Sequence, residues 1–192
     1  MKCDDHLRAF IAIDISTIIR EKITRFQKHM SEVGAHASWI KPINIHLTLT
    51  FLGDIPVQSL EIISDIMDDV SALHKSFTCE IKGVGYFGKG KSTRIIWIGF
   101  AGDLQGLVSV QMDLFRRIMT TGVHLDNKPF VPHLTIARIN PRHHASNIVS
   151  LLQPYKENLF GNLSVKDLIL YRSELGPNGP SYTEMHRSPL RL

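Results

Sequence analysis

The sequence is poor in cysteine and has no long apolar run. Its 192 residues include two cysteines, Cys3 and Cys79, which suit neither a disulfide framework nor a metal-binding knuckle. No segment reaches the roughly 20 consecutive apolar residues that a membrane-spanning helix needs. Residues 1–6 lack the apolar stretch of a signal peptide. We therefore expect a soluble protein of the cytoplasm with no membrane partner, and we take it to be a monomer.

Signatures of several enzyme classes are missing as well. The glycine-rich residues 85–91 lack the spacing of a P-loop and do not lead directly into a helix, which disfavours an ATP-using enzyme. No His-Glu-x-x-His or Cys-x-x-Cys pattern is present, so no metal or other cofactor is expected. His143 and His144 could still join a zinc site, but we interpret them as solvated loop residues.

What the chain does contain is ordinary for a globular protein, with a slight basic excess. Hydrophobic residues make up 43% and charged residues 21%, and the length suits a single domain over residues 1–192. The net charge is +4 and the pI is near 9.1. A surface of this charge permits an anionic ligand without requiring one.

One short pattern occurs twice. His46-Leu47-Thr48-Leu49 and His133-Leu134-Thr135-Ile136 lie 87 residues apart, and each follows a Lys-Pro pair at the same distance. Both segments have the composition of a strand. Alternate residues of a regular strand share a face, so the His and Thr of each copy should lie together, with Thr50 in the first copy and Ala137 in the second. A single His-x-Thr is most simply structural, but its duplication favours a functional site.

The elements around the two motifs repeat in the same order. An apolar strand, an amphipathic helix and a His-containing strand occur in each half of the chain. The expected fold class is therefore α/β (α+β), with two lobes contributed by roughly residues 8–90 and 92–190, related by a pseudo-two-fold axis, whose His faces meet across a groove. The expected elements are a strand at 9–15, a helix between 16 and 34, strands at 45–52 and 77–84, a helix at 58–73, a loop at 85–91, a strand at 94–100, a helix at 103–121, the second His strand, a helix at 145–155, a strand at 160–170, a turn at 173–180 and a strand at 181–186.

Two facing His-Thr pairs suit chemistry at a phosphate. One histidine can be neutral while the other is protonated near neutral pH, so one can remove a proton while the other delivers one. The hydroxyls of Thr48 and Thr135 can donate hydrogen bonds to an anionic centre between the rings. The two motifs contain no acidic residue or cysteine, and no serine nucleophile is evident. The motif pattern is symmetric and does not say which histidine is the acid.

These residues resemble the 2H phosphoesterases, and among them the RNA 2',3'-cyclic phosphodiesterase branch, which includes proteins similar to 2'-5' RNA ligases. The similarity spans nearly the whole chain. It rests on residues 8–13, 44–53, 94–99, 129–138 and 173–182.

The resemblance implies duplicated βαβ-type lobes in which two antiparallel sheets flank a central groove. It implies metal-independent hydrolysis of RNA 2',3'-cyclic phosphate ends to a 2'-phosphomonoester, with His46 as proton donor and His133 as proton acceptor. It also implies that Thr48, Thr135 and Arg138 bind the phosphate. Arg138 lies five residues after His133, so a regular strand would turn it to the opposite face; a bulge or the end of the strand near Ala137 could re-aim it.

Other readings of the same motifs remain open. The reverse reaction would be 2'-5' RNA ligation, and tRNA fragments would be suitable substrates for either direction. The chain could instead cleave 2'-5' oligonucleotides or small cyclic nucleotides. A non-catalytic RNA-binding module is the alternative from another class, although such a module would not need both histidines.

Overall fold

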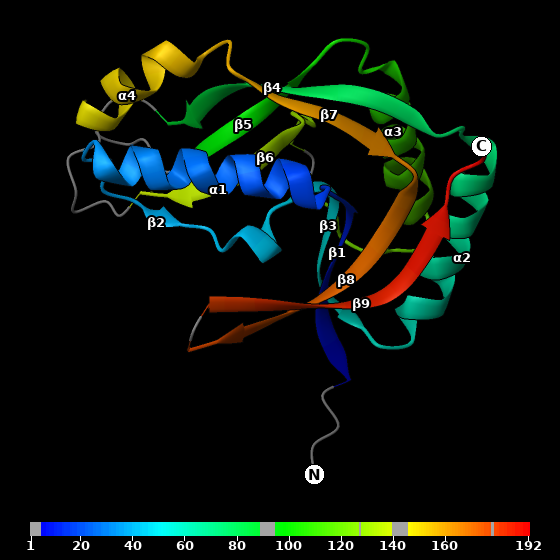
Figure 1. The fold of residues 1–192 in the computed structure, drawn as a ribbon. Coiled ribbons are helices and arrows are strands. Elements are labelled where there is room, and N and C mark those ends of the chain that lie inside the picture. The colour runs from blue at the N-terminus through cyan, green and yellow to red at the C-terminus, as the bar shows by residue number, and fades with distance from the viewer. Residues whose placement is uncertain (1–4, 89–94, 127, 140–145, 178) are drawn as a thin grey trace.

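One strongly curved antiparallel sheet organises the chain (Figure 1). The structure, a computed structural model, describes residues 5–88, 95–126, 128–139, 146–177 and 179–192. Its strands are β1 (His6–Asp14), β2 (Ser38–Trp39), β3 (His46–Pro56), β4 (Phe77–Phe87), β5 (Ile95–Ala101), β6 (His133–Arg138), β7 (Leu159–Val165), β8 (Asp167–Gly176) and β9 (Gly179–Pro189). The helices are α1 (Thr17–Glu32), α2 (Ser59–Leu73), α3 (Gln105–Met119) and α4 (Ser146–Leu152), with the 3-10 turns η1 (Pro42–Asn44) and η3 (Gln153–Tyr155).

The sheet consists of two halves joined at a narrow seam. The strand order is β7-β4-β5-β6-β3-β1-β8-β9, and β2 adds to β6. Strands β3 and β6 pair only at Leu47 and Leu134, each in the middle of a His-x-Thr motif. The predicted α/β fold with antiparallel strands is confirmed, but the two expected sheets are connected through this one pair of residues.

Each half of the sheet takes strands from both halves of the chain. β4 pairs with β5 and β7, whereas β8 pairs with β1 and β9. The halves of the sheet therefore do not coincide with residues 8–90 and 92–190, because β2 and β4 join β5, β6 and β7, whereas β8 and β9 join β1 and β3. The pairing itself repeats: Asp14 lies opposite His46 as Gly99 lies opposite His133, and Ala12 lies opposite Thr48 as Trp97 lies opposite Thr135.

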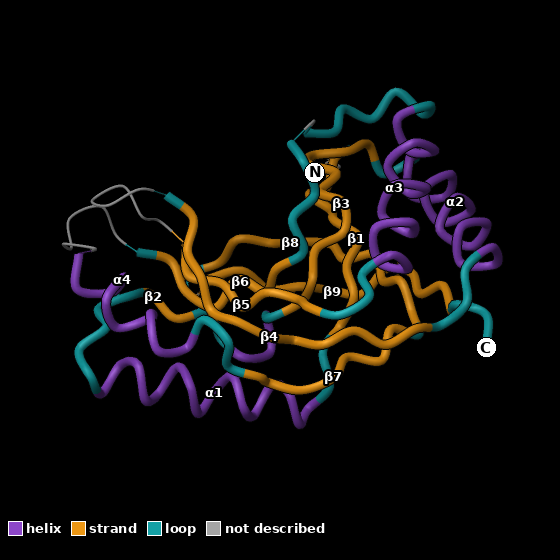
Figure 2. The backbone as a smooth tube through the Cα atoms, turned by 90° about the horizontal axis from the view of Figure 1, so that it is seen from above, coloured by secondary structure: helices purple, strands orange, loops and turns teal. Residues whose placement is uncertain are grey.

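The helices also cross between the halves. α1 follows β1 but contacts β7 and η1, and α3 follows β5 but contacts β3 and α2. Figure 2 shows α1 along one side of the sheet and the pair α2 and α3 at the other end. The inner face of α1 buries Ile19, Ile23, Phe26 and Met30, and such side chains stabilise a fold by roughly 1.5–3 kcal/mol each.

Several strands differ in length from the prediction. β3 runs on to Pro56 because Gly53 adopts a positive φ of 72° beside a register shift, which lets the strand bend instead of ending. β4 continues through residues 85–87, and β8 extends through residues 173–176, both expected to be loops.

The expected strand at 160–170 is two strands. It is interrupted at Lys166, after which β8 joins the other half of the sheet from β7. The short strand β2 was not predicted. No helix in the described part of the chain is long and apolar enough to cross a membrane.

Candidate active site

A cleft of about 410 Å³ lies over the seam between the two halves of the sheet. Both His-x-Thr motifs open into it, so the tertiary structure brings together the two segments that the sequence singled out. Its walls combine imidazole, hydroxyl, guanidinium and aromatic groups: Arg8, Phe10, Ile40, Asn44, His46, Thr48, Phe51, His133, Thr135, Arg138, Ser173, Leu175, Pro180 and Tyr182.

His46 is held on every side by neighbours. Its Nε2 atom lies 3.1 Å from the Thr48 hydroxyl, and the ring also forms a hydrogen bond with the backbone of Asn44. Phe10 stacks on the ring with centroids 4.6 Å apart, and Tyr182 presents its edge at 5.2 Å. The ring therefore has a fixed orientation before any substrate binds.

Burial dominates the electrostatics of His46. Loss of hydration disfavours the charged ring and lowers its pKa to about 4. The Asn44 backbone contact and the carboxylate of Asp14 act in the opposite direction, while the guanidinium of Arg20 lowers the pKa further. The ring is thus neutral in the free protein near pH 7, and a negative charge in the cleft is what would favour its protonation.

His133 is oriented through its backbone. Its Nδ1 atom lies 2.7 Å from the carbonyl oxygen of Val131. A carbonyl oxygen can only accept, so Nδ1 carries the proton and the neutral ring leaves Nε2 free to accept another. The edge-on ring of Phe87 lies 4.9 Å away. Each motif histidine is therefore anchored to the backbone two residues before it, Val131 here and Asn44 in the first copy.

Matching bulges decide which later residues reach the cleft. In β3 the ladder passes from Thr48 to Thr50 and leaves Leu49 without a partner in β1. In β6 it passes from Thr135 to Ala137 and leaves Ile136 without a partner in β5. An extra residue reverses the alternation that follows it, so the buried Thr50 and Ala137 leave the cleft face, contrary to the expectation from a regular strand.

The residues that replace them on the cleft face are Phe51 and Arg138. The bulge in β6 has a specific support. Gln27 of α1, which is buried, donates through Nε2 to the carbonyl oxygens of Ile136 and Ile40 at 3.0 and 2.9 Å. The carbonyl oxygen of Ile136 also accepts from the backbone N–H of Ile40 at 2.9 Å, so Gln27 adds a second donor to the bulge carbonyl.

The sequence reasoning missed several cleft residues. Arg8 lies over the Phe51 ring, 4.8 Å from its centroid, and Tyr182 comes from β9 at the far end of the chain. Asn44 donates through Nδ2 to the carbonyl oxygen of Pro180 at 2.8 Å, which ties η1 to the β8–β9 hairpin. Arg8 could have been noticed in the sequence, because it is a charged residue directly before the apolar strand expected at 9–15. No local sequence pattern distinguishes Asn44 or Tyr182.

The metal site that His143 and His144 could have joined was the less favoured alternative. Among the described residues, no three His, Cys, Asp or Glu side chains form a cluster that could hold a metal ion. His143 and His144 lie outside the described residues. The polar side chains of the two motifs that line the cleft are those of histidine, threonine and arginine.

Comparisons with known proteins identify relatives of this chain. Residues 13–97 match the family model described as LigT like Phosphoesterase. The RNA 2',3'-cyclic phosphodiesterase of Aquifex aeolicus is 33% identical over 179 residues, covering 92% of this chain and 94% of that protein. The protein of the same name from Methanocaldococcus jannaschii is 31% identical over 176 residues, covering 92% and 96%.

Solved structures show the same fold. A crystal structure of a Thermus thermophilus protein is 26% identical and superimposes with a TM-score of 0.80, covering 96% of this chain and 98% of that one. Escherichia coli LigT complexed with 3'-AMP also gives 0.80, at 23% identity, covering 97% and 99%. The chain belongs to the LigT-like phosphoesterases of the 2H superfamily.

Proposed function

We propose that this protein hydrolyses the 2',3'-cyclic phosphodiester at RNA 3' ends to a 2'-phosphomonoester. The observation that carries the proposal is the convergence of His46, Thr48, His133 and Thr135 in one cleft. The names of the relatives, RNA 2',3'-cyclic phosphodiesterase, support the same activity. We propose a single domain acting as a cytoplasmic monomer.

Each histidine has a defined proton to move. His133 accepts a proton from water through Nε2 while the water oxygen forms a bond to phosphorus. The bond between phosphorus and the 3' oxygen breaks, and His46 delivers its proton to that oxygen. One proton enters and one leaves, so the reaction needs no metal and no covalent enzyme intermediate.

The remaining polar groups stabilise the charge that develops on the phosphate. Thr48 and Thr135 each donate to a non-bridging oxygen, and Arg138 adds a cation on the His133 side. A proton donor must be protonated, yet the low pKa of His46 leaves its ring neutral near pH 7 in the free protein. The bound phosphodiester removes this conflict. Its negative charge raises the low pKa of the ring, so the donor becomes protonated only when substrate occupies the cleft.

The outer cleft suits the single-stranded end of an RNA. Phe51, capped by Arg8, offers an aromatic face on which any base can stack. A stacking platform selects weakly among sequences, which is consistent with tRNA fragments or other cleaved RNAs as substrates. Because hydrolysis and 2'-5' ligation share the cyclic phosphate, the same groups would catalyse ligation when a 5'-hydroxyl RNA replaces water.

The decisive experiment is product analysis on a defined oligonucleotide ending in a 2',3'-cyclic phosphate. We expect a 2'-phosphate product and unchanged turnover in EDTA. Formation of the 3'-phosphate would overturn the proposed leaving group, and loss of activity in EDTA would favour metal catalysis. Binding without turnover would indicate a non-catalytic RNA-binding module. Turnover confined to 2'-5' linkages or to small cyclic nucleotides would identify the other alternative.

A further inference from the structure

The two histidines have different cross-strand neighbours. Asp14 of β1 lies opposite His46, and Gly99 of β5 lies opposite His133, at the corresponding place in the duplicated pairing. Directly opposed residues in an antiparallel pair carry their side chains on one face of the sheet, with Cβ atoms about 5 Å apart. One half of the site therefore has a carboxylate opposite its histidine, whereas the other half has a glycine at that position.

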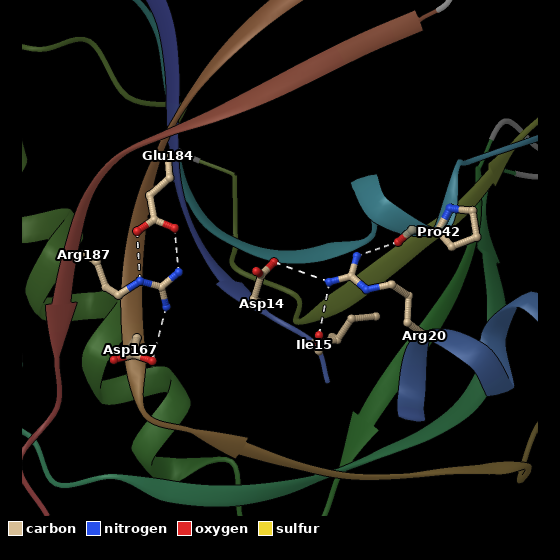
Figure 3. A network of polar contacts seen from close by, with 7 residues as sticks. All are labelled: Asp14, Ile15, Arg20, Pro42, Asp167, Glu184 and Arg187. Carbon is tan, nitrogen blue, oxygen red and sulfur yellow. Dashed lines mark hydrogen bonds and ion pairs between the residues drawn. The ribbon is translucent and has the colours of Figure 1, made fainter. Parts of the chain in front are cut away.

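Asp14 forms an ion pair with Arg20 of α1 (Figure 3). The Nη2 atom of Arg20 lies 3.9 Å from Oδ1 of Asp14 and donates to the carbonyl oxygen of Ile15 at 3.1 Å. Its Nη1 atom donates to the carbonyl oxygen of Pro42 at 2.7 Å. Pro42 begins η1, the turn that ends with Asn44. Arg20 thus links Asp14 to the backbone segment on which the His46 ring is anchored.

Tyr171 of β8 completes the support. Its hydroxyl forms a hydrogen bond with Asp14, and burial together with the charge of Asp14 raises the pKa of the phenol. The Tyr171 and His46 rings lie 6.4 Å apart between centroids. Asp14 lines a second cavity of about 370 Å³ and not the cleft, so its carboxylate lies beside His46 without lining the cleft.

From this arrangement we propose that Asp14 is a positioning residue that makes His46, rather than His133, the proton donor of the reaction. The inference rests on the proposed function and supplies what the symmetric motifs leave undecided. A fixed carboxylate stabilises an imidazolium beside it. Because Gly99 replaces it in the other half, only the His46 imidazolium gains that stabilisation.

The other groups that face His46 do not provide an equivalent charge. Arg20 of α1 opposes protonation, and Tyr171 and Tyr182 of β8 and β9 are neutral phenols. The Asn44 backbone and Thr48 supply neutral hydrogen-bond partners. Burial raises the pKa of Tyr182 while the charges of Arg138 and Arg8 act against that rise, and both arginines line the cleft. Asp14 is the carboxylate among these neighbours.

The test compares Asp14→Asn with wild type by the pH dependence of kcat on a 2',3'-cyclic oligonucleotide. The donor must be protonated, so we expect the alkaline limb of the profile to move to lower pH by about 1 unit, with about a tenfold loss of kcat on that limb. Asp14→Glu should restore most of the limb.

Controls separate charge from folding and from the proposed function. Asp69→Asn makes the same change in net charge on α2, where Asp69 pairs with Arg117, and should leave the profile unchanged. Equal thermal unfolding midpoints for wild type and Asp14→Asn would exclude misfolding as the cause, and an NMR titration of the His46 ring should show its pKa lower in the variant.

Three results would overturn the inference in distinguishable ways. An active wild type whose alkaline limb stays in place in Asp14→Asn overturns the role of Asp14 alone. Movement of the acidic limb in Asp14→Asn would instead show that the histidine beside Asp14, His46, is the base, which reverses the proposed roles of the two histidines. An inactive wild type overturns the proposed function, and the donor role with it.

Discussion

The two halves of the cleft have the same backbone and different surroundings. In each half, the backbone two residues before the histidine anchors its ring, and a threonine follows two residues after it. A bulge then turns the residue five positions after the histidine into the cleft. The first half encloses its histidine in aromatic rings beside Asp14, whereas the second has Gly99 and places Arg138 in the cleft. The duplication thus sets the geometry, and the neighbours make the two roles unequal.

Removing either imidazole should cause the largest loss of activity among the substitutions that compare the two halves of the cleft. His46→Ala and His133→Ala should each lower kcat/KM about 10²–10⁴-fold, the usual contribution of a positioned acid or base. The residual activities should differ in their pH dependence, because His46→Ala removes the acid and its alkaline limb, and His133→Ala removes the base and its acidic limb. Loss of the same limb in both variants would contradict unequal roles.

The enclosed histidine should also make stability depend on pH. The folded pKa of His46, about 4, is below its unfolded value of 6.5, so the unfolded chain binds the proton more readily. Stability from this group is complete above pH 6.5 and is lost as the pH falls towards 4, by about 3 kcal/mol. Urea unfolding of wild type and His46→Gln should give parallel curves above pH 7 that converge in acid. Parallel curves down to pH 4 would show that the ring is not desolvated.

Substitution of either threonine should lower kcat by a similar factor, but only one substitution should change the pH dependence of the reaction. Thr48→Val and Thr135→Val each remove one donor to the phosphate at nearly constant volume, so we expect about a 10²-fold loss of kcat in each. Thr48 also contacts Nε2 of His46, so only Thr48→Val should shift the pH profile. The Ser variants should recover most of the activity, and a loss that Ser does not rescue would indicate a packing role.

Gln27 supports the bulge of the second half only. Gln27→Met should lower the free energy of unfolding by about 2 kcal/mol, because the buried carbonyl oxygens of Ile136 and Ile40 lose a donor. It should also raise KM if the bulge is what aims Arg138 into the cleft. Lys28→Met on the exposed side of the same helix is the control, since its surface ion pair contributes little. Unchanged stability in Gln27→Met would show that the bulge does not depend on this contact.

The smallest effects are expected for Phe51 and Arg138, the two residues that the bulges turn into the cleft. Arg138→Met should weaken substrate affinity about tenfold and flatten its dependence on salt, because a phosphate contact is lost. Phe51→Met should weaken affinity by a similar or smaller factor and keep the salt dependence, because only stacking is reduced. Identical salt slopes for wild type and Arg138→Met would argue against a phosphate contact.

Local pattern was sufficient for much of the fold and for the centre of the site. The helices at 58–73 and 103–121 and the strands carrying the motifs follow from apolar periodicity, and the structure confirms them at Ser59–Leu73, Gln105–Met119, β3 and β6. Periodicity was insufficient where the chain bends. The strand expected at 160–170 divides at Lys166 because its two parts pair with different partners, β4 and β1, and pairing partners are not encoded in a local window.

The sequence by itself determined that two His-x-Thr segments exist, that both are strands and that they belong to one duplicated pattern, since residue type and spacing are local properties. Only the tertiary structure decided that the segments meet at Leu47 and Leu134. It also decided that bulges exchange Thr50 for Phe51 and Ala137 for Arg138 on the cleft face, and that Asp14 lies beside one histidine alone. Those outcomes depend on register between strands far apart in the chain, and a shift of a single residue in register reverses the face to which every following side chain points.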